Sequence, residues 1–279
     1  MSTPRPLSLR KRIMWKVAIV LLVVYGTALL TLYFSQRSFM YHPNIGAEPE
    51  FLAKSTAHGV LPWRDESGKL IGWKRETSGA KRKMLVLHGN GGDALSRTYL
   101  MDGFEKIGGW DFYVLEYPGY GWREGTISET AILAAAHDAL KELQRKDNRP
   151  IFATGESLGT GVACLLAGKN PTAIQGLFLV TPYTSTSDVA AGRFPFFPTR
   201  LLMQDKFDAT RALREYSGPV AIVLAGNDFI VPTRFGQALF DGYDGPKKLW
   251  IQPEAGHNSL DFDPDSALWK EVVHFLLAP

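Results

Sequence analysis

The chain has 279 residues, of which 45% are hydrophobic and 21% charged, a balance that excludes a mainly disordered or fibrous protein. Its single cysteine, Cys164, excludes an intramolecular disulfide framework and a metal site built from several cysteines. The formal net charge is +3, but residues 1–16 hold five of the 31 basic residues and no acidic one, which leaves 26 basic against 28 acidic residues, a net −2, in the rest. Since no basic face remains to bind phosphates, we expect no nucleic-acid partner.

An uncharged apolar run occupies residues 17–34. As a helix it would span about 27 Å, close to the thickness of a bilayer core. A buried core helix rarely lacks charge over five turns, and a secretory signal has a shorter apolar region and a small-residue cleavage site, which residues 35–38 do not offer. We therefore expect residues 1–36 to be a cytoplasmic tail and an uncleaved transmembrane signal-anchor that contacts the membrane through residues 13–34.

Basic residues set the expected orientation of this anchor. Five of them precede the apolar run, against one or two just after it. The positive-inside rule then predicts a cytoplasmic N-terminus. Residues 37–279 would form one folded domain on the periplasmic, extracellular or lumenal side of the membrane.

Strands and helices alternate from about residue 58 onward. Two strands at 58–64 and 70–76 are expected to form a hairpin. Short apolar runs typical of strands buried on both faces follow at 83–88, 112–116, 151–154, 177–180, 220–224 and 249–251. Helical patterns occur at 94–107, 129–146, 158–167 and 266–277. The alternation predicts an α/β fold with a mostly parallel, doubly wound sheet, and the aromatic- and proline-rich residues 185–217 are expected to form a short cap over it.

A candidate nucleophile lies between a predicted strand and a predicted helix. The sequence Gly155-Glu156-Ser157-Leu158-Gly159 matches G-x-S-x-G, which in this context forms a sharp turn that exposes the serine. The turn leaves no room for a Cβ two residues before or after the serine, where Gly155 and Gly159 stand. The helix N-terminus that follows presents N–H groups to developing negative charge. The alternative, a simple glycine-rich turn, does not explain this combination.

A serine nucleophile needs a base and a group that orients the base. His257, in Ala255-Gly256-His257-Asn258, follows the last predicted strand, and Asp228 follows the strand before it. The chain order Ser, Asp, His is that of α/β-hydrolases, and the ends of parallel strands meet at one edge of the sheet. Asp188 is the second candidate for the acid, although it also fits a helix N-cap. The other histidines, His42, His58, His137 and His274, precede the core or lie inside predicted helices.

A glycine-rich loop follows the strand at 83–88. It reads His88-Gly89-Asn90-Gly91-Gly92, and its backbone could approach a ligand closely. We expect the backbone N–H groups of Asn90 and Leu158 to form the oxyanion hole. A phosphate-binding loop is the alternative, but the Lys-Ser/Thr pair of a P-loop and the G-x-G-x-x-G spacing are both missing. His88 is expected to support the loop through hydrogen bonds rather than act as a base.

Together these motifs resemble a known family. The set HGNGG (88–92), EYPGYG (116–121), GESLGTG (155–161), GNDFIVP (226–232) and AGHN (255–258) is similar to the α/β-hydrolase superfamily over residues 60–278. Within it, the chain resembles the membrane-anchored Bem46-like and ABHD12/13/17-like serine hydrolases. The resemblance implies a Ser157, Asp228 and His257 triad with an Asn90 and Leu158 oxyanion hole. The family's D-x-R-G-Y-G loop carries Glu116 and Pro118 here in place of its Asp and Arg. The resemblance therefore does not say which residue, if any, replaces the contacts of that Arg in this chain.

These features lead to one main functional expectation. The chain is expected to be a serine esterase or lipase-like hydrolase that cleaves ester or thioester bonds of lipid or acyl-chain substrates, with no metal and no organic cofactor implied. Three alternatives stay open at this point: acyl transfer to an alcohol or amine, peptidase activity, and a non-catalytic hydrolase-fold protein that binds partners at the membrane.

Overall fold

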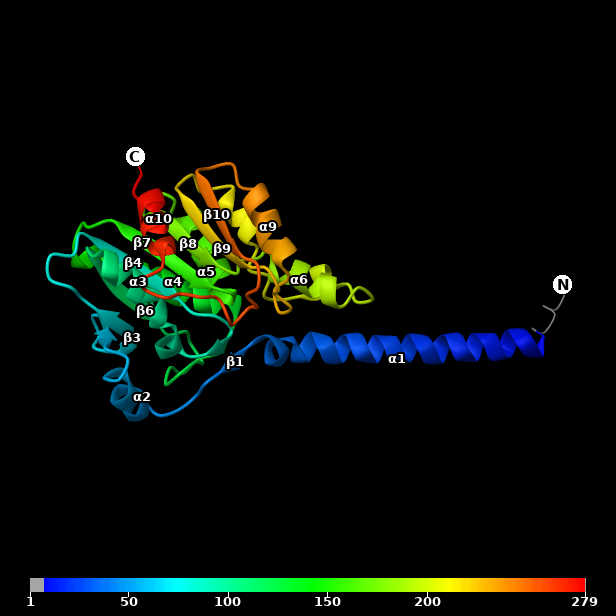
Figure 1. Ribbon diagram of the computed structural model, residues 1–279. Helices are drawn as coiled ribbons and strands as arrows, with labels where there is room; N and C mark the ends of the chain where they lie inside the picture. Colours follow the sequence, from blue (N-terminus) through cyan, green and yellow to red (C-terminus); the bar gives the residue numbers. More distant parts are fainter. Residues whose placement is uncertain (1–7, 279) are drawn as a thin grey trace. The chain divides into compact units, whose positions relative to one another are not determined.

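The computed structural model describes residues 8–278 and consists of two units that meet in sequence between Met40 and Tyr41. The first is the helix α1 (Leu9–Met40), none of whose described residues is buried (Figure 1). This helix contains the whole apolar run and is long and apolar enough to cross a membrane. Arg5, one of the five basic residues ahead of the run, lies outside the described residues.

The second unit is built on an eight-stranded sheet with the strand order β10-β9-β8-β7-β4-β6-β3-β2. The pairs β2–β3 and β3–β6 are antiparallel and all other neighbouring pairs are parallel. The strands are β2 (Leu61–Arg64), β3 (Leu70–Arg75), β4 (Arg82–Leu87), β6 (Trp110–Leu115), β7 (Ile151–Glu156), β8 (Ile174–Val180), β9 (Val220–Ala225) and β10 (Lys247–Gln252). The predicted α/β fold, with an initial hairpin and a mostly parallel sheet, is confirmed.

Helices cover both faces of this sheet, because successive strand residues point to opposite sides. Met84 and Val86 of β4 share one core cluster with Phe104 and Trp269, which come from the two helices on that face. Leu85 of the same strand is also fully buried and points to the opposite face. The helices around the sheet are α2 (Glu48–Ser55), α3 (Tyr99–Ile107), α4 (Glu129–Lys146), α5 (Leu158–Lys169), α9 (Thr233–Asp241) and α10 (Ala267–Leu276).

Three short helices lie between β8 and β9, where the cap was expected. They are α6 (Thr186–Arg193), α7 (Thr199–Leu202) and α8 (Ala209–Leu213). The helix α8 packs closely on α5, since a Cβ added to Gly168 would lie 2.3 Å from the carbonyl oxygen of Ala212. The helices α6 and α7 pair with each other, and the apolar side chains of Phe194 and Phe196, in the link between them, and of Leu201, in α7, are exposed.

The structure corrects several predicted elements. The helix expected at 94–107 is divided into a 3-10 turn, η1 (Ala94–Arg97), and α3, because a capping box at Asp93 starts the first turn and the chain restarts at Thr98. The helices α2 and α9 were not predicted. Nor was a two-stranded parallel pair formed by β1 (His42–Pro43) and β5 (Gly91–Gly92).

Candidate active site

Ser157 lies at the turn between β7 and α5, in the sharp geometry that the motif predicts. Its φ of 50° and ψ of −118° fall in a region that non-glycine residues rarely adopt. A Cβ on Gly155 would lie 2.2 Å from the carbonyl oxygen of Gly159, and a Cβ on Gly159 would lie 2.1 Å from that of Leu87. Both positions therefore require glycine, because the turn formed by residues 155–159, called the elbow below, packs its backbone directly against other backbone.

The structure brings Ser157 together with His257 and Asp228. Nε2 of His257 lies 3.0 Å from Oγ of Ser157, and Nδ1 of His257 lies 2.6 Å from Oδ2 of Asp228. The other carboxylate oxygen of Asp228 accepts backbone N–H groups from Ile230, at 2.9 Å, and Val231, at 2.8 Å. The side chains of His257 and Asp228 are almost fully buried. Asp228 is thus held in an orientation that aims one oxygen at the imidazole.

The glycine-rich loop 88–92 lies beside this serine. A Cβ on Gly89 would be 3.6 Å from Cβ of Ser157, so the loop packs directly on the elbow. The strand pair β1–β5 holds the loop from outside through hydrogen bonds from the His42 N–H to the Asn90 carbonyl and from the Asn44 N–H to the Gly92 carbonyl. Leu158 begins α5, where the first N–H groups of a helix have no partner inside the helix.

His88 and Glu116 form a fully buried pair under this loop. Nε2 of His88 lies 3.1 Å from Oε1 of Glu116, and Nδ1 of His88 lies 2.9 Å from the carbonyl oxygen of Gly89. That carbonyl shares a peptide group with the N–H of Asn90, so an Nδ1–H donated by His88 fixes the direction of this N–H. That His88 supports the loop through these contacts stays a prediction.

The loop after β6 departs from the family pattern at Pro118, and the structure shows which residue lies nearby instead. Arg123 donates from Nη1 to the backbone carbonyl of Glu116 at 2.5 Å. Burial is the main cause that lowers the pKa of Arg123 from its ordinary value. Tyr120 donates its hydroxyl to the Asn90 carbonyl at 2.8 Å, so this loop also supports the neighbouring glycine-rich loop.

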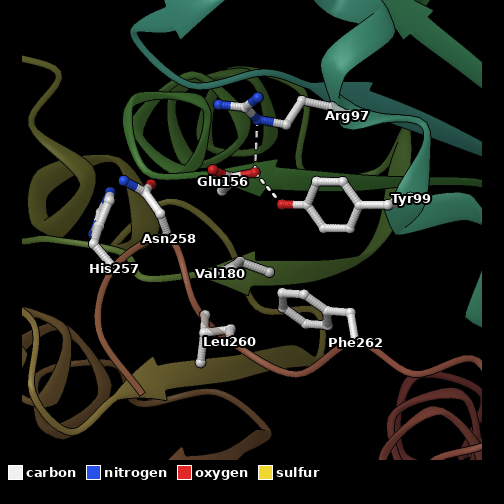
Figure 2. Close-up of a pocket in the computed structure, with 8 residues that line it drawn as sticks. All are labelled: Arg97, Tyr99, Glu156, Val180, His257, Asn258, Leu260 and Phe262. Atoms are coloured by element: carbon white, nitrogen blue, oxygen red, sulfur yellow. Dashed lines mark hydrogen bonds and ion pairs between the residues drawn. The ribbon is translucent and has the colours of Figure 1, made fainter.

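A pocket of about 320 Å³ opens beside His257 (Figure 2). Its wall has an apolar part and a polar, partly charged part. The sequence motifs did not reveal the charged residues. The apolar side chains are those of Val180, Leu260 and Phe262. The polar side chains are Arg97, Tyr99, Glu156, His257 and Asn258. No sequence signal could have placed Arg97 and Tyr99 here, because their contact with Glu156 joins segments about 60 residues apart.

The alternative candidates lie in other surroundings. Asp188 is not the N-cap of α6: Ser185 is, and its Oγ accepts the backbone N–H of Asp188 at 3.0 Å. The Asp188 carboxylate instead accepts from Nε of Arg200 at 2.8 Å and from the Thr184 hydroxyl at 2.9 Å. His58 contacts Thr98, and His137 contacts Asn170. Of these side chains, none lines the pocket beside His257.

Comparisons with known proteins identify the family of the chain. A family model described as the alpha/beta hydrolase fold matches residues 83–211. An uncharacterized protein of Mycobacterium tuberculosis, Rv2307c, is 32% identical over 272 residues that cover 93% of each chain. The lysophosphatidylserine lipase ABHD12 of Danio rerio is 28% identical over 64% of this chain and 52% of its own length. The protein bem46 of Schizosaccharomyces pombe is 26% identical over 66% of this chain and 64% of its own length.

Solved structures share the fold at lower identity. TT1662 from Thermus thermophilus superimposes with a TM-score of 0.63 and 21% identity, over 79% of this chain and 99% of its own. The Pyrococcus furiosus esterase PF2001 also reaches a TM-score of 0.63, at 15% identity, over 85% of this chain and 96% of its own. From its fold, its motifs and these relatives, the chain belongs to the α/β-hydrolase family, in the Bem46-like branch, whose members and structural neighbours include lipases and esterases.

Proposed function

We propose that this α/β hydrolase is a serine hydrolase that cleaves ester or thioester bonds through an acyl-enzyme on Ser157. The observation that carries the proposal is the continuous contact from Ser157 through His257 to Asp228, with 3.0 Å and 2.6 Å between the successive atoms. These distances are within the range needed for proton transfer between a nucleophile and its base. The strained turn at Ser157 supports the same assignment, since such strain is concentrated at functional sites.

The proposed reaction proceeds in two halves. Oγ of Ser157 attacks the acyl carbonyl carbon while Nε2 of His257 takes its proton, and Asp228 stabilises the imidazolium. The N–H groups of Asn90 and Leu158 donate to the oxyanion, and His257 then protonates the leaving alcohol or thiol. Water, deprotonated by His257, attacks the acyl-enzyme, and the proton returns to Ser157 as the acid is released.

The nucleophile is tested with a fluorophosphonate probe, which phosphonylates activated serines. Wild-type protein should be labelled, and Ser157→Ala should not. Ser185, a buried serine at the start of α6 that does not contact His257, provides a matched control through Ser185→Ala, which should be labelled like wild type. Equal labelling of wild type and Ser157→Ala would remove Ser157 as the nucleophile.

Lipid or acyl-chain substrates are the proposed class. Support comes from the apolar pocket wall at Val180, Leu260 and Phe262, and from the exposed Phe229 and Ile230 directly after Asp228. The name of the Danio rerio relative, a lysophosphatidylserine lipase, points to the same class. The test compares lysophospholipids with p-nitrophenyl esters of 2 to about 12 carbons, each with wild type and Ser157→Ala. Turnover limited to the shortest water-soluble esters would refute a lipid substrate.

The helix α1 is proposed to anchor the enzyme with its N-terminus in the cytoplasm and the catalytic unit on the other side. The support is the length and exposure of this apolar helix and the basic residues ahead of it. In bacterial spheroplasts, protease added outside should digest the catalytic unit while a cytoplasmic marker protein stays intact. A catalytic unit that survives until the membrane is permeabilised would reverse the orientation.

A further inference from the structure

The residue that precedes the nucleophile carries a carboxylate. Glu156 is the last residue of β7, and its side chain is only 8% exposed. It lines the same pocket as His257 (Figure 2). A buried carboxylate next to Ser157 is unfavourable for the proposed chemistry, because its charge has the same sign as the oxyanion that forms there. Some other group must compensate this charge.

Arg97 supplies the opposite charge from a different segment of the chain. Its Nε lies 2.7 Å from Oε2 of Glu156, and the arginine side chain is itself only 16% exposed. The same guanidinium also contacts the glycine-rich loop: Nη2 donates to the Gly91 carbonyl at 3.4 Å and would lie 3.2 Å from a Cβ on Gly89. One side chain thus contacts both segments from which the two oxyanion donors are proposed to come.

Tyr99 completes the surroundings of Glu156. Its hydroxyl donates to the same Oε2 atom that faces Arg97 (Figure 2). Burial, followed by the negative charge of Glu156, raises the pKa of Tyr99, so its hydroxyl stays a neutral donor. The titratable and charged groups that line the pocket are therefore Arg97 and Tyr99 from the segment after β5, Glu156 from β7 and His257 from the loop after β10. Arg97 is the permanent cation among them.

We propose that Arg97 is a positioning residue of the reaction, which compensates the charge of Glu156 beside the nucleophile and holds the glycine-rich loop against the elbow. The inference rests on the proposed serine-hydrolase function and deepens it. Without Arg97, a bare carboxylate opposes oxyanion formation, and the loop loses one of its links to the elbow. The transition state is affected more than substrate binding, so kcat falls while KM changes little.

Variants separate the charge from the general stability of the fold. Arg97→Met removes the charge but keeps most of the volume, Glu156→Gln removes the carboxylate, and the double variant removes both. Arg64→Met is the matched control, because Arg64 also pairs with a glutamate, Glu48 at 3.1 Å, but on the exposed edge strand β2. Fluorophosphonate labelling, kcat and KM for p-nitrophenyl butyrate, and thermal unfolding are measured for each variant.

The single change Arg97→Met is expected to lower kcat about 100-fold, the scale of losing one oxyanion donor, with KM within about threefold of wild type. The double variant should recover most of this loss, because no uncompensated charge remains. Glu156→Gln alone should cost less than Arg97→Met, and Arg64→Met should match wild type. In Arg97→Met the acidic limb of the kcat/KM profile should move to higher pH, because a bare carboxylate favours protonation of the catalytic base. In the double variant the acidic limb should return to its wild-type pH.

Each outcome decides between separate ideas. If wild type is neither labelled nor active, the serine-hydrolase function is wrong and the assignment of Arg97 is wrong with it. If wild type is active but Arg97→Met keeps full kcat, the assignment of Arg97 alone is overturned. The assignment would also be overturned if Arg97→Met lost kcat together with thermal stability, showed no shift in its pH profile and was not rescued by Glu156→Gln. Such a result would mean that the contact of Arg97 is purely structural.

Discussion

Replacing Asp228 by asparagine tests, with the least change in shape, whether Asp228 orients His257 as the proposed catalytic base. Oδ1 of Asp228 accepts two backbone N–H groups, from Ile230 and Val231. In the variant, the amide oxygen must occupy this position, because an NH2 group there would face two donors. The amide NH2 then points at Nδ1 of His257 and donates to it.

This donation selects the wrong form of the imidazole. If Nδ1 accepts a hydrogen bond, the proton of neutral His257 resides on Nε2, which lies 3.0 Å from Oγ of Ser157. An N–H at that position cannot take the serine proton. In a serine protease with this triad the same kind of change lowers kcat about 10⁴-fold. At 1.36 kcal/mol per factor of ten, this corresponds to about 5 kcal/mol in activation free energy.

The assay compares kcat of wild type, Asp228→Asn, Asp228→Ala and Asp188→Asn on one ester, with Ser157→Ala as the background. Asp228→Asn should lose about 10⁴-fold activity and keep nearly all of its free energy of unfolding, because both backbone donors stay bonded. Asp228→Ala should also lose stability, by about 1–3 kcal/mol for each donor left buried without a partner. Asp188→Asn should stay active. Activity of Asp228→Asn within tenfold of wild type would refute the tautomer argument.

Two further predictions concern other groups. Burial raises the pKa of the Cys164 thiol. A thiol reagent such as Ellman's reagent should therefore not react with the folded protein and should react once per chain in denaturant. Reaction with the folded protein would contradict the burial of Cys164. Partial burial opposes the charge of Glu76, but hydrogen bonds from Lys146, Lys74 and Tyr113 lower its pKa to about 2. The free energy of unfolding should therefore be larger for wild type than for Glu76→Gln above about pH 4.5, and this difference should disappear as the pH falls toward 2. Denaturant unfolding at several pH values measures it. A difference that does not change with pH would exclude this linkage between the charge of Glu76 and stability.

The parts of the fold that the sequence predicts have local causes. The strand β9 and residues 84–87 of β4 are continuous apolar runs, and α4 carries a regular helical period with Ser128 as N-cap. The elbow is predictable for the same reason, since a steric requirement for glycine acts within five residues. The helix α9 was not predicted, although Pro232 precedes it in a position that suits a helix start. Gly236 lowers the helix propensity inside it and is needed where the helix packs on Leu224.

Features that depend on distant side chains could not be predicted. The contact between Arg97 and Glu156 joins a 3-10 turn to the end of a strand, and neither residue belongs to a periodic pattern. The pairing of His88 with Glu116 likewise depends on how β4 and β6 lie side by side. The motifs predicted which residues meet around Ser157, but not the charged residues that surround them. The assignment of roles within that group stays a prediction until the variants are measured.

The strand β1 has a practical consequence for any version of the protein that is shortened at its N-terminus. Only Tyr41 separates the last residue of α1 from His42, whose N–H is bonded to the Asn90 carbonyl. Residues 42–44 therefore belong to the folded unit and support the loop at 88–92 through the pairing of β1 with β5. A truncated chain that begins at Tyr41 keeps this support, whereas one that begins after Gly46 loses, along with α1, the N–H groups of His42 and Asn44 that bond to the carbonyls of Asn90 and Gly92.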